Sequence, residues 1–195
     1  LARPHDEGWS FVHDLLRESL EKRARDGGRW AAHHRICAAA IRARGGPVSV
    51  ERLGHYMLGA GDFDGALEQL TIGIRSRLAA GDGPLADALF EAWKEAFARL
   101  DPPEGDSRHG LAAVFAAHLS FSAAQYDRAA ERAEQARQLA RQHQWVELEA
   151  EALLCIAHAA HQLGDYDGSR VALAEIAPFA DALQKGLESQ YWVAV

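Results

Sequence analysis

The hexapeptide GDFDGA at residues 61–66 returns as GDYDGS at residues 164–169 and, in a weaker form, as AQYDRA at residues 124–129. In each copy a small residue can end one helix, and in the two closer copies an Asp can cap the next one. An aromatic residue follows, and three positions later a small residue allows two helices to approach closely. The recurring hexapeptide therefore predicts a helix-to-helix turn that is built several times along the chain.

The segments between these turns have helical periodicity. Apolar residues recur at helical spacing, as at Leu111, Val114 and Phe115, and no segment alternates apolar and polar residues over strand length. Breaks rich in Gly, Pro and Asp divide the chain into helices of about 10–18 residues joined by short turns. The sequence therefore predicts an all-α fold of stacked antiparallel helix hairpins, without strands beyond incidental bridges.

The spacing of the turn residues matches a known repeat. Tyr126 and Tyr166 lie 40 residues apart, and a small residue, Ala117 or Ala157, stands nine residues before each of them. The chain resembles the tetratricopeptide (TPR) family over residues 107–182 and, less closely, over residues 48–80. This resemblance implies a right-handed superhelix in which the aromatic residue of each turn is buried between hairpins. The repeat-defining residues are Gly61, Phe63, Ala117, Tyr126, Ala157, Gly164 and Tyr166.

The chain departs from the TPR pattern in one respect. A TPR has about 34 residues, whereas the repeat in this chain is longer, and an additional helix is expected at residues 84–99. The register of the middle repeat, around residues 84–106, is therefore left open.

A second resemblance covers residues 11–70. FVHDLLRESL at residues 11–20, HHRICAAA at residues 33–40 and ERLGHY at residues 51–56 follow one another. This series resembles the region after the ATPase core of bacterial signal-transduction ATPases, which include LuxR-type and maltose-regulator-like transcription factors and Ser/Thr kinase–ATPase fusions. The resemblance implies that residues 1–46 connect to an upstream domain and that residues 47–195 form the repeats. Because the chain starts with Leu1 and ends in apolar residues, we expect both ends to be cuts in a longer protein.

The charge distribution and the hydropathy of the sequence indicate which classes of partner the chain can bind and where it is located. The net charge is −7; residues 1–60 carry ten Lys/Arg and seven Asp/Glu, whereas residues 61–195 carry eleven and twenty-one. Acidic repeats repel phosphate backbones, so that nucleic acid is disfavoured and protein or peptide partners are favoured. The chain has neither a long apolar run nor a signal-peptide pattern, so we expect a cytoplasmic protein that does not span a membrane. Cys37 and Cys155 lie in Ala-rich stretches, where a thiol usually packs as a small hydrophobe.

Motifs for catalysis are absent from the sequence. There is no P-loop, no HExxH, no GxSxG and no CxxC. The stretch GAGDFDG at residues 59–65 has one residue too many for a dinucleotide-binding loop and follows a helical pattern. We therefore predict a segment that is not an enzyme and holds neither a cofactor nor a metal ion.

Several histidines occupy equivalent positions in the repeats. His118 and His158 each lie eight residues before a turn tyrosine, and His55 lies eight residues before Phe63. In the TPR pattern this position faces the concave surface. His55 joins the row of His118 and His158 only if the helix at residues 84–99 does not rotate the earlier hairpin out of phase. One interpretation is a row of ligand contacts; the other is that imidazoles simply fill half-buried positions between helices. The candidate contact residues are His55, His118, Phe121, His158 and His161.

A basic stretch precedes the repeats. Residues 17–44 hold eight Lys/Arg and three Asp/Glu, and they include His33 and His34. Such a stretch can bind phosphate, but it more often forms a solvated face or packs on an acidic neighbour.

Two functions remain open for the whole chain. It is a module that binds a protein, a peptide, another domain of the parent chain or a small effector, or it is a spacer or lid that supports an ATPase or kinase domain elsewhere in the parent.

Overall fold

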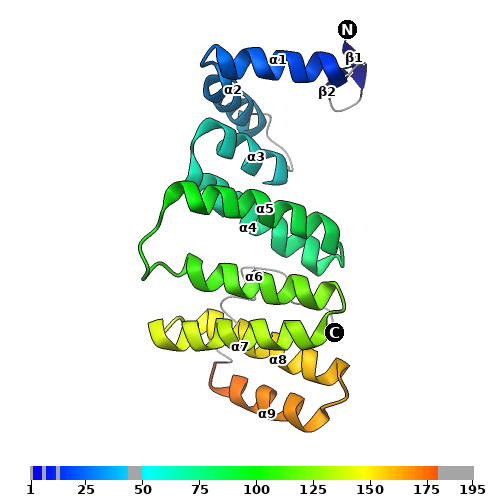
Figure 1. Cartoon of the computed structure of the whole chain (residues 1–195), viewed down its shortest axis with the longest axis vertical. Helices are drawn as coiled ribbons and strands as arrows, with labels where there is room; N and C mark the ends of the chain where they lie inside the picture. Colours follow the sequence, from blue (N-terminus) through cyan, green and yellow to red (C-terminus); the bar gives the residue numbers. More distant parts are fainter. Residues whose placement is uncertain (1, 6–7, 12–13, 44–49, 180–195) are drawn as a thin grey trace.

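The computed structural model describes residues 2–5, 8–11, 14–43 and 50–179, which form a stack of helices along one long axis (Figure 1). Helices dominate the described part of the chain, as the hydrophobic periodicity predicts. The helices are α1 (Asp14–Asp26), α2 (Trp30–Ala43), α3 (Val50–Ala60), α4 (Phe63–Ala79), α5 (Gly83–Leu100), α6 (Arg108–Ser122), α7 (Tyr126–His143), α8 (Val146–Gln162), α9 (Tyr166–Ile176) and a final 3-10 turn (Ala177–Phe179).

A short hairpin precedes the helices. Strand β1 (Ala2–His5) pairs antiparallel with β2 (Gly8–Phe11), so that Ala2 lies opposite Phe11 and His5 opposite Gly8. The expectation of a chain without strands is wrong for this hairpin. Pro and Gly disfavour a helix in this stretch, and four-residue strands are too short for alternation to stand out in the sequence. The expected boundary between residues 46 and 47 lies outside the described residues.

The predicted turns are confirmed where the hexapeptide occurs. Gly61 and Gly164 adopt positive φ angles of 81° and 82°, which only glycine reaches without strain. Backbone hydrogen bonds close each turn, as from the Gly164 amide to the His161 carbonyl at 3.1 Å. Asp165 then caps α9 by accepting a hydrogen bond from the Gly168 amide at 2.9 Å. Local sequence therefore dictates where these helices end and begin.

A further copy of this turn was missed in the sequence. Gly81 has a φ of 73°, and Asp82 accepts a hydrogen bond from the Leu85 amide at 3.3 Å, so α5 begins as α4 and α9 do. Residues 84–99 are thus part of the regular succession of helices rather than an insertion in it.

The helices from α3 onward alternate between two layers. Each helix packs against the next one, and α3 also contacts α5, α4 contacts α6, and α6 contacts α8. We call the two sets the α4–α6–α8 layer and the α5–α7–α9 layer, which includes α3. Because α5 takes its own place in this alternation, α4 lies with α6 and α8. The sequence-based register had instead placed α3 with α6 and α8.

The turn aromatics are less buried than the TPR resemblance implies. Tyr166 is 66% exposed, and Phe63 and Tyr126 are half-buried. Tyr126 packs on Phe121 with ring centroids 5.4 Å apart, and Tyr166 packs on His161 at 5.3 Å. These rings therefore cover the turn that precedes their own helix. The predicted burial of Tyr166 is therefore wrong.

Two kinds of core hold the stack together. Between α3 and α6 the buried residues are large, and Trp93, Phe115, Leu70 and Ile74 have almost no exposed surface. Between α6 and α9 the buried residues are mostly alanines; they include Ala117, Ala129, Ala133, Ala136, Ala152 and Ala159, with Val114 and Cys155.

Candidate functional site

The structure brings His118 and His158 together on the α4–α6–α8 layer. His118 projects from α6 and His158 from α8, and the two rings are close enough to interact electrostatically. The ring of Phe121 lies 6.1 Å from that of His158, and His161 also acts on His158. Four of the five candidate residues thus gather at the carboxyl ends of α6 and α8. That they contact a ligand stays a prediction.

The surroundings of these histidines keep them uncharged. Burial, followed by the charge of Arg75 and by His158, lowers the pKa of His118 from 6.5 to about 4. Burial and then His161 lower the pKa of His158 as well. Neutral imidazoles both donate and accept hydrogen bonds, so at neutral pH this site offers polar contacts without adding positive charge.

An ion pair crosses the same layer. Arg75 on α4 donates to Glu151 on α8, with Nη2 2.7 Å from Oε1, although α6 lies between the two helices. The Arg75 guanidinium also lies over the ring of Phe115 on α6, 6.0 Å from its centroid. Both charged side chains are about four-fifths buried, so solvent screens their attraction only partly. These contacts join three helices into one face.

Sequence reasoning missed Arg75 and Glu151. The two residues are 76 positions apart, and neither stands at a position that the repeat marks. A second ion pair, between Arg108 on α6 and Asp64 on α4, was missed for the same reason; its Nη1 and Oδ1 atoms are 2.5 Å apart. Contacts of this kind depend on which helices share a layer, and the sequence-based register had separated α4 from α6.

His55 does not belong to this face. It lies on α3, in the other layer, and is exposed. It lines a separate pocket of about 630 Å³ together with Trp30, His34 and Arg99, which come from α2 and α5. The equivalence of His55 with His118 and His158 fails because α3 and α6 occupy different layers. The structure therefore corrects the predicted row to His118, Phe121, His158 and His161.

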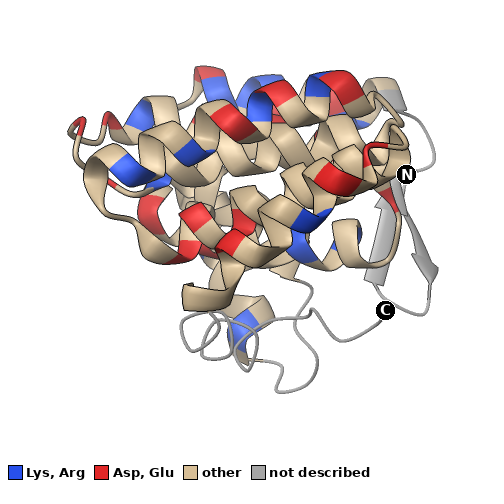
Figure 2. Cartoon of the chain, turned by 90° about the horizontal axis from the view of Figure 1, so that it is seen from below, with Lys and Arg blue, Asp and Glu red and all other residues tan. Residues whose placement is uncertain are grey.

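In the basic stretch that forms α1 and α2, the arginine side chains contact residues that lie close to them in the sequence. Arg17 and Arg25 pair with Glu21 on the same helix, and the guanidinium of Arg25 lies 4.2 Å from the ring centroid of Trp30. Figure 2, which colours the ribbon by charge, shows Lys or Arg and Asp or Glu positions interspersed along several helices.

The described residues include neither a metal-binding group nor a membrane-spanning helix. Within the described ranges, no three His, Cys, Asp or Glu side chains are grouped in a way that could hold a metal ion. None of the described helices combines the length and the apolar character that crossing a bilayer requires. Cys155 is buried among alanines, and this burial raises the pKa of its thiol to about 12, so that Cys155 stays an unreactive thiol.

Comparisons of this chain with models of protein families, with curated proteins and with solved structures give no match.

Proposed function

We propose that this chain is a non-catalytic, TPR-like module of a larger bacterial regulatory protein and binds a protein or peptide through the α4–α6–α8 face. The observation that carries this proposal is the meeting of His118 and His158 from successive helices of one layer, beside Phe121. Side chains at equivalent repeat positions form a column along a stack of repeats, and such columns provide extended binding surfaces.

The chemistry of this face defines the partner. Arg75 is already paired with Glu151, and burial lowers the pKa of both His118 and His158, so these residues give the face aromatic and hydrogen-bonding groups with little net charge. Such a surface suits an extended or helical peptide with alternating polar and apolar side chains. The partner is either a separate protein or another domain of the parent chain.

A specific observation favours a second function, that of a spacer or lid for an ATPase or kinase domain of the parent. Along α6, no residue from Arg108 to Phe121 is classed as exposed. The strongly desolvated His118 fits packing between helices as well as it fits recognition. In that case the face would have structural value and no partner of its own.

A peptide display library panned against the chain separates these functions. Selected peptides would then be measured against a double variant, His158→Ala with His161→Ala. These two residues are chosen because His158 is half-buried and His161 is exposed, so the fold should survive their loss. The matched control is Arg170→Ala on α9, which removes a side chain that is 81% exposed.

If the chain is a binding module, the double variant should lose at least about tenfold in affinity for the selected peptides, and the control should bind them as the unaltered chain does. If no peptide is enriched, or if enriched peptides bind the double variant as well as the parent, the spacer function replaces the proposal. Circular dichroism of both variants would verify that they are folded.

A further inference from the structure

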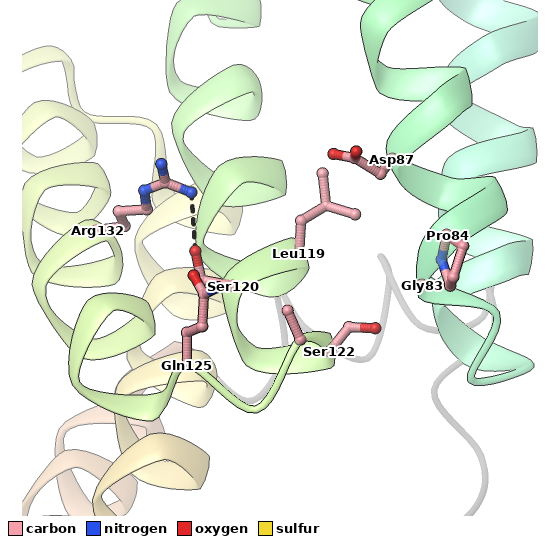
Figure 3. A pocket seen from close by; sticks show the side chains of 9 residues that line it. Gly83, Pro84, Asp87, Leu119, Ser120, Ser122, Gln125 and Arg132 are labelled. Carbon is pink, nitrogen blue, oxygen red and sulfur yellow. Dashed lines mark hydrogen bonds between the residues drawn. The ribbon is translucent and has the colours of Figure 1, made fainter.

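A pocket of about 410 Å³ lies between α5 and α7 and is also lined by the carboxyl end of α6 (Figure 3). Its side chains come from three helices: Asp87 from α5, Leu119 and Ser120 from α6, and Arg132 from α7. Asp87 and Arg132 approach it from α5 and α7, the helices of the other layer. The pocket therefore shares α6 with the α4–α6–α8 face, but both of its charged side chains come from the other layer.

Arg132 is held in place by a buried network. Its Nη1 donates to the Ser120 hydroxyl at 2.8 Å and to the Ala116 carbonyl at 3.1 Å. Ser120 is only 3% exposed, and its hydroxyl also donates to the Ala116 carbonyl at 3.0 Å. The Nε and Nη2 groups make no hydrogen bond to any other part of the described chain. A fixed guanidinium with donors to spare is suited to bind a carboxylate.

Asp87 provides the opposite charge. Figure 3 shows its carboxylate directed from α5 toward the side of the pocket where Leu119 and Arg132 lie. Within residues 50–179 it has neither a hydrogen bond nor an ion pair, whereas Glu149, Glu151 and Glu175 each bind an arginine. Asp87 and Arg132 are not paired with each other, so each can take a group of the opposite charge from one ligand.

The other residues that line the pocket determine its size and provide its apolar surface. Leu119 lies between the two charged side chains in the close-up view. A Cβ atom on Gly83 would lie 2.2 Å from the Ser122 hydroxyl, so a larger residue at this position would require the Ser122 side chain to move. The volume is at the lower end of the range for small-molecule sites, which is about 300–1,000 Å³.

We propose that this pocket binds a free amino acid with an apolar side chain. The α-carboxylate contacts Arg132, the α-ammonium contacts Asp87, and the side chain packs on Leu119. An anion without an ammonium group would meet the uncompensated Asp87 carboxylate, and a cation without a carboxylate would meet Arg132. The pair of opposite charges thus selects a zwitterion over either singly charged ligand.

Isothermal titration calorimetry with L-leucine, N-acetyl-L-leucine and L-leucinamide tests this proposal on the whole chain. Each of the two derivatives lacks one charge, and each should bind at least about tenfold more weakly than L-leucine. Thermal-shift measurements with each standard amino acid would show whether another apolar side chain fits better. If no standard amino acid binds at about 10 mM, a concentration at which even a weak site with a Kd near 1 mM is filled, the proposal is wrong.

Three variants assign the contacts. Asp87→Asn should weaken L-leucine and L-leucinamide at least about tenfold, whereas N-acetyl-L-leucine, which no longer meets an uncompensated carboxylate, should bind more tightly than it binds the unaltered chain. Ala123→Trp, at an exposed lining position, should block all three ligands by filling the pocket. The control Asp127→Asn removes an exposed carboxylate from the first turn of α7 and should change nothing. Equal affinity of L-leucine for Asp87→Asn and for the unaltered chain would overturn the assignment.

Discussion

The core between α3 and α6 is built from a few large side chains, whereas the core between α6 and α9 is built from many alanines. In the first region Trp93 stacks on Phe97 with ring centroids 5.0 Å apart and meets Phe115 edge to face at 6.1 Å. In the second region alanine methyl groups, such as those of Ala133 and Ala136, separate the helices. Small residues let helices approach closely, so this region gains stability from many contacts that are weak one by one. The first region instead relies on a small number of residues.

The largest effect is expected for Trp93→Ala. Trp93 has no exposed surface, and its indole Nε1 donates to the Thr71 hydroxyl at 3.0 Å. Removing this ring leaves a cavity and an unpaired hydroxyl, so the free energy of unfolding should fall by about 3–5 kcal/mol. Urea unfolding followed by circular dichroism measures this change. Trp145→Ala, at a half-buried position in the alanine-rich region, serves as the control and should cost less than half as much.

The next effect depends on pH. His118 has a pKa of about 4 in the folded chain, against 6.5 when unfolded. Between these pH values the unfolded chain binds the proton more readily than the folded chain. The contribution of neutral His118 to the free energy of unfolding is therefore complete above pH 6.5 and decreases as the pH falls toward 4. The loss due to His118 approaches about 3 kcal/mol.

Urea unfolding near pH 7 and near pH 4.5 would measure that loss. His118→Gln should show a weaker dependence on pH than the unaltered chain, and His33→Gln, at an exposed position on α2, should not. An unchanged dependence in His118→Gln would mean that other groups cause the acid sensitivity.

Overpacking tests the alanine-rich region directly. Ala136 is completely buried where α6, α7 and α8 meet, and leucine at this position needs space that the closely packed helices lack. We expect Ala136→Leu to lower the free energy of unfolding by about 1–3 kcal/mol. Gln135→Leu, one residue earlier and exposed, should stay within about 0.5 kcal/mol. If both variants are neutral in thermal and urea unfolding, the helices are less tightly packed than the structure indicates.

The smallest effect concerns the turn between α6 and α7. Ala124 has a φ of 56° at the place where Gly61 and Gly164 stand in the other turns. A left-handed conformation is strained for alanine, so Ala124→Gly should raise the free energy of unfolding by about 0.5–1 kcal/mol. Gly164→Ala should lower it by a similar amount. Changes of the same sign in the two variants would contradict this account.

Local features of the fold could be predicted from the sequence, and features that depend on helix pairing could not. The turns at residues 61–62 and 164–165 follow from glycine conformation and aspartate capping, which involve only neighbours in the chain. The layer to which α3 belongs depends on α5, whose own turn at Gly81 lacks the following aromatic and was not recognised as a copy.

The same distinction applies to the candidate site. His118 and His158 were found because both lie after α5, where the repeat spacing is regular. His55 was misplaced because it lies before α5. Arg75 and Glu151 leave no periodic signal, since an ion pair between distant helices imposes no spacing on the sequence.

The ion pair across α6 also has a mechanical consequence. A stack in which helices touch only their near neighbours stretches like a spring when its ends are pulled apart. The bond between Arg75 and Glu151 fastens α4 to α8 and encloses α6, so these three helices resist tension as one stiff block. Opening this block would also leave two largely desolvated charges without partners. We therefore expect less extension under load within α4, α6 and α8 than at α2 and α3 or at α9.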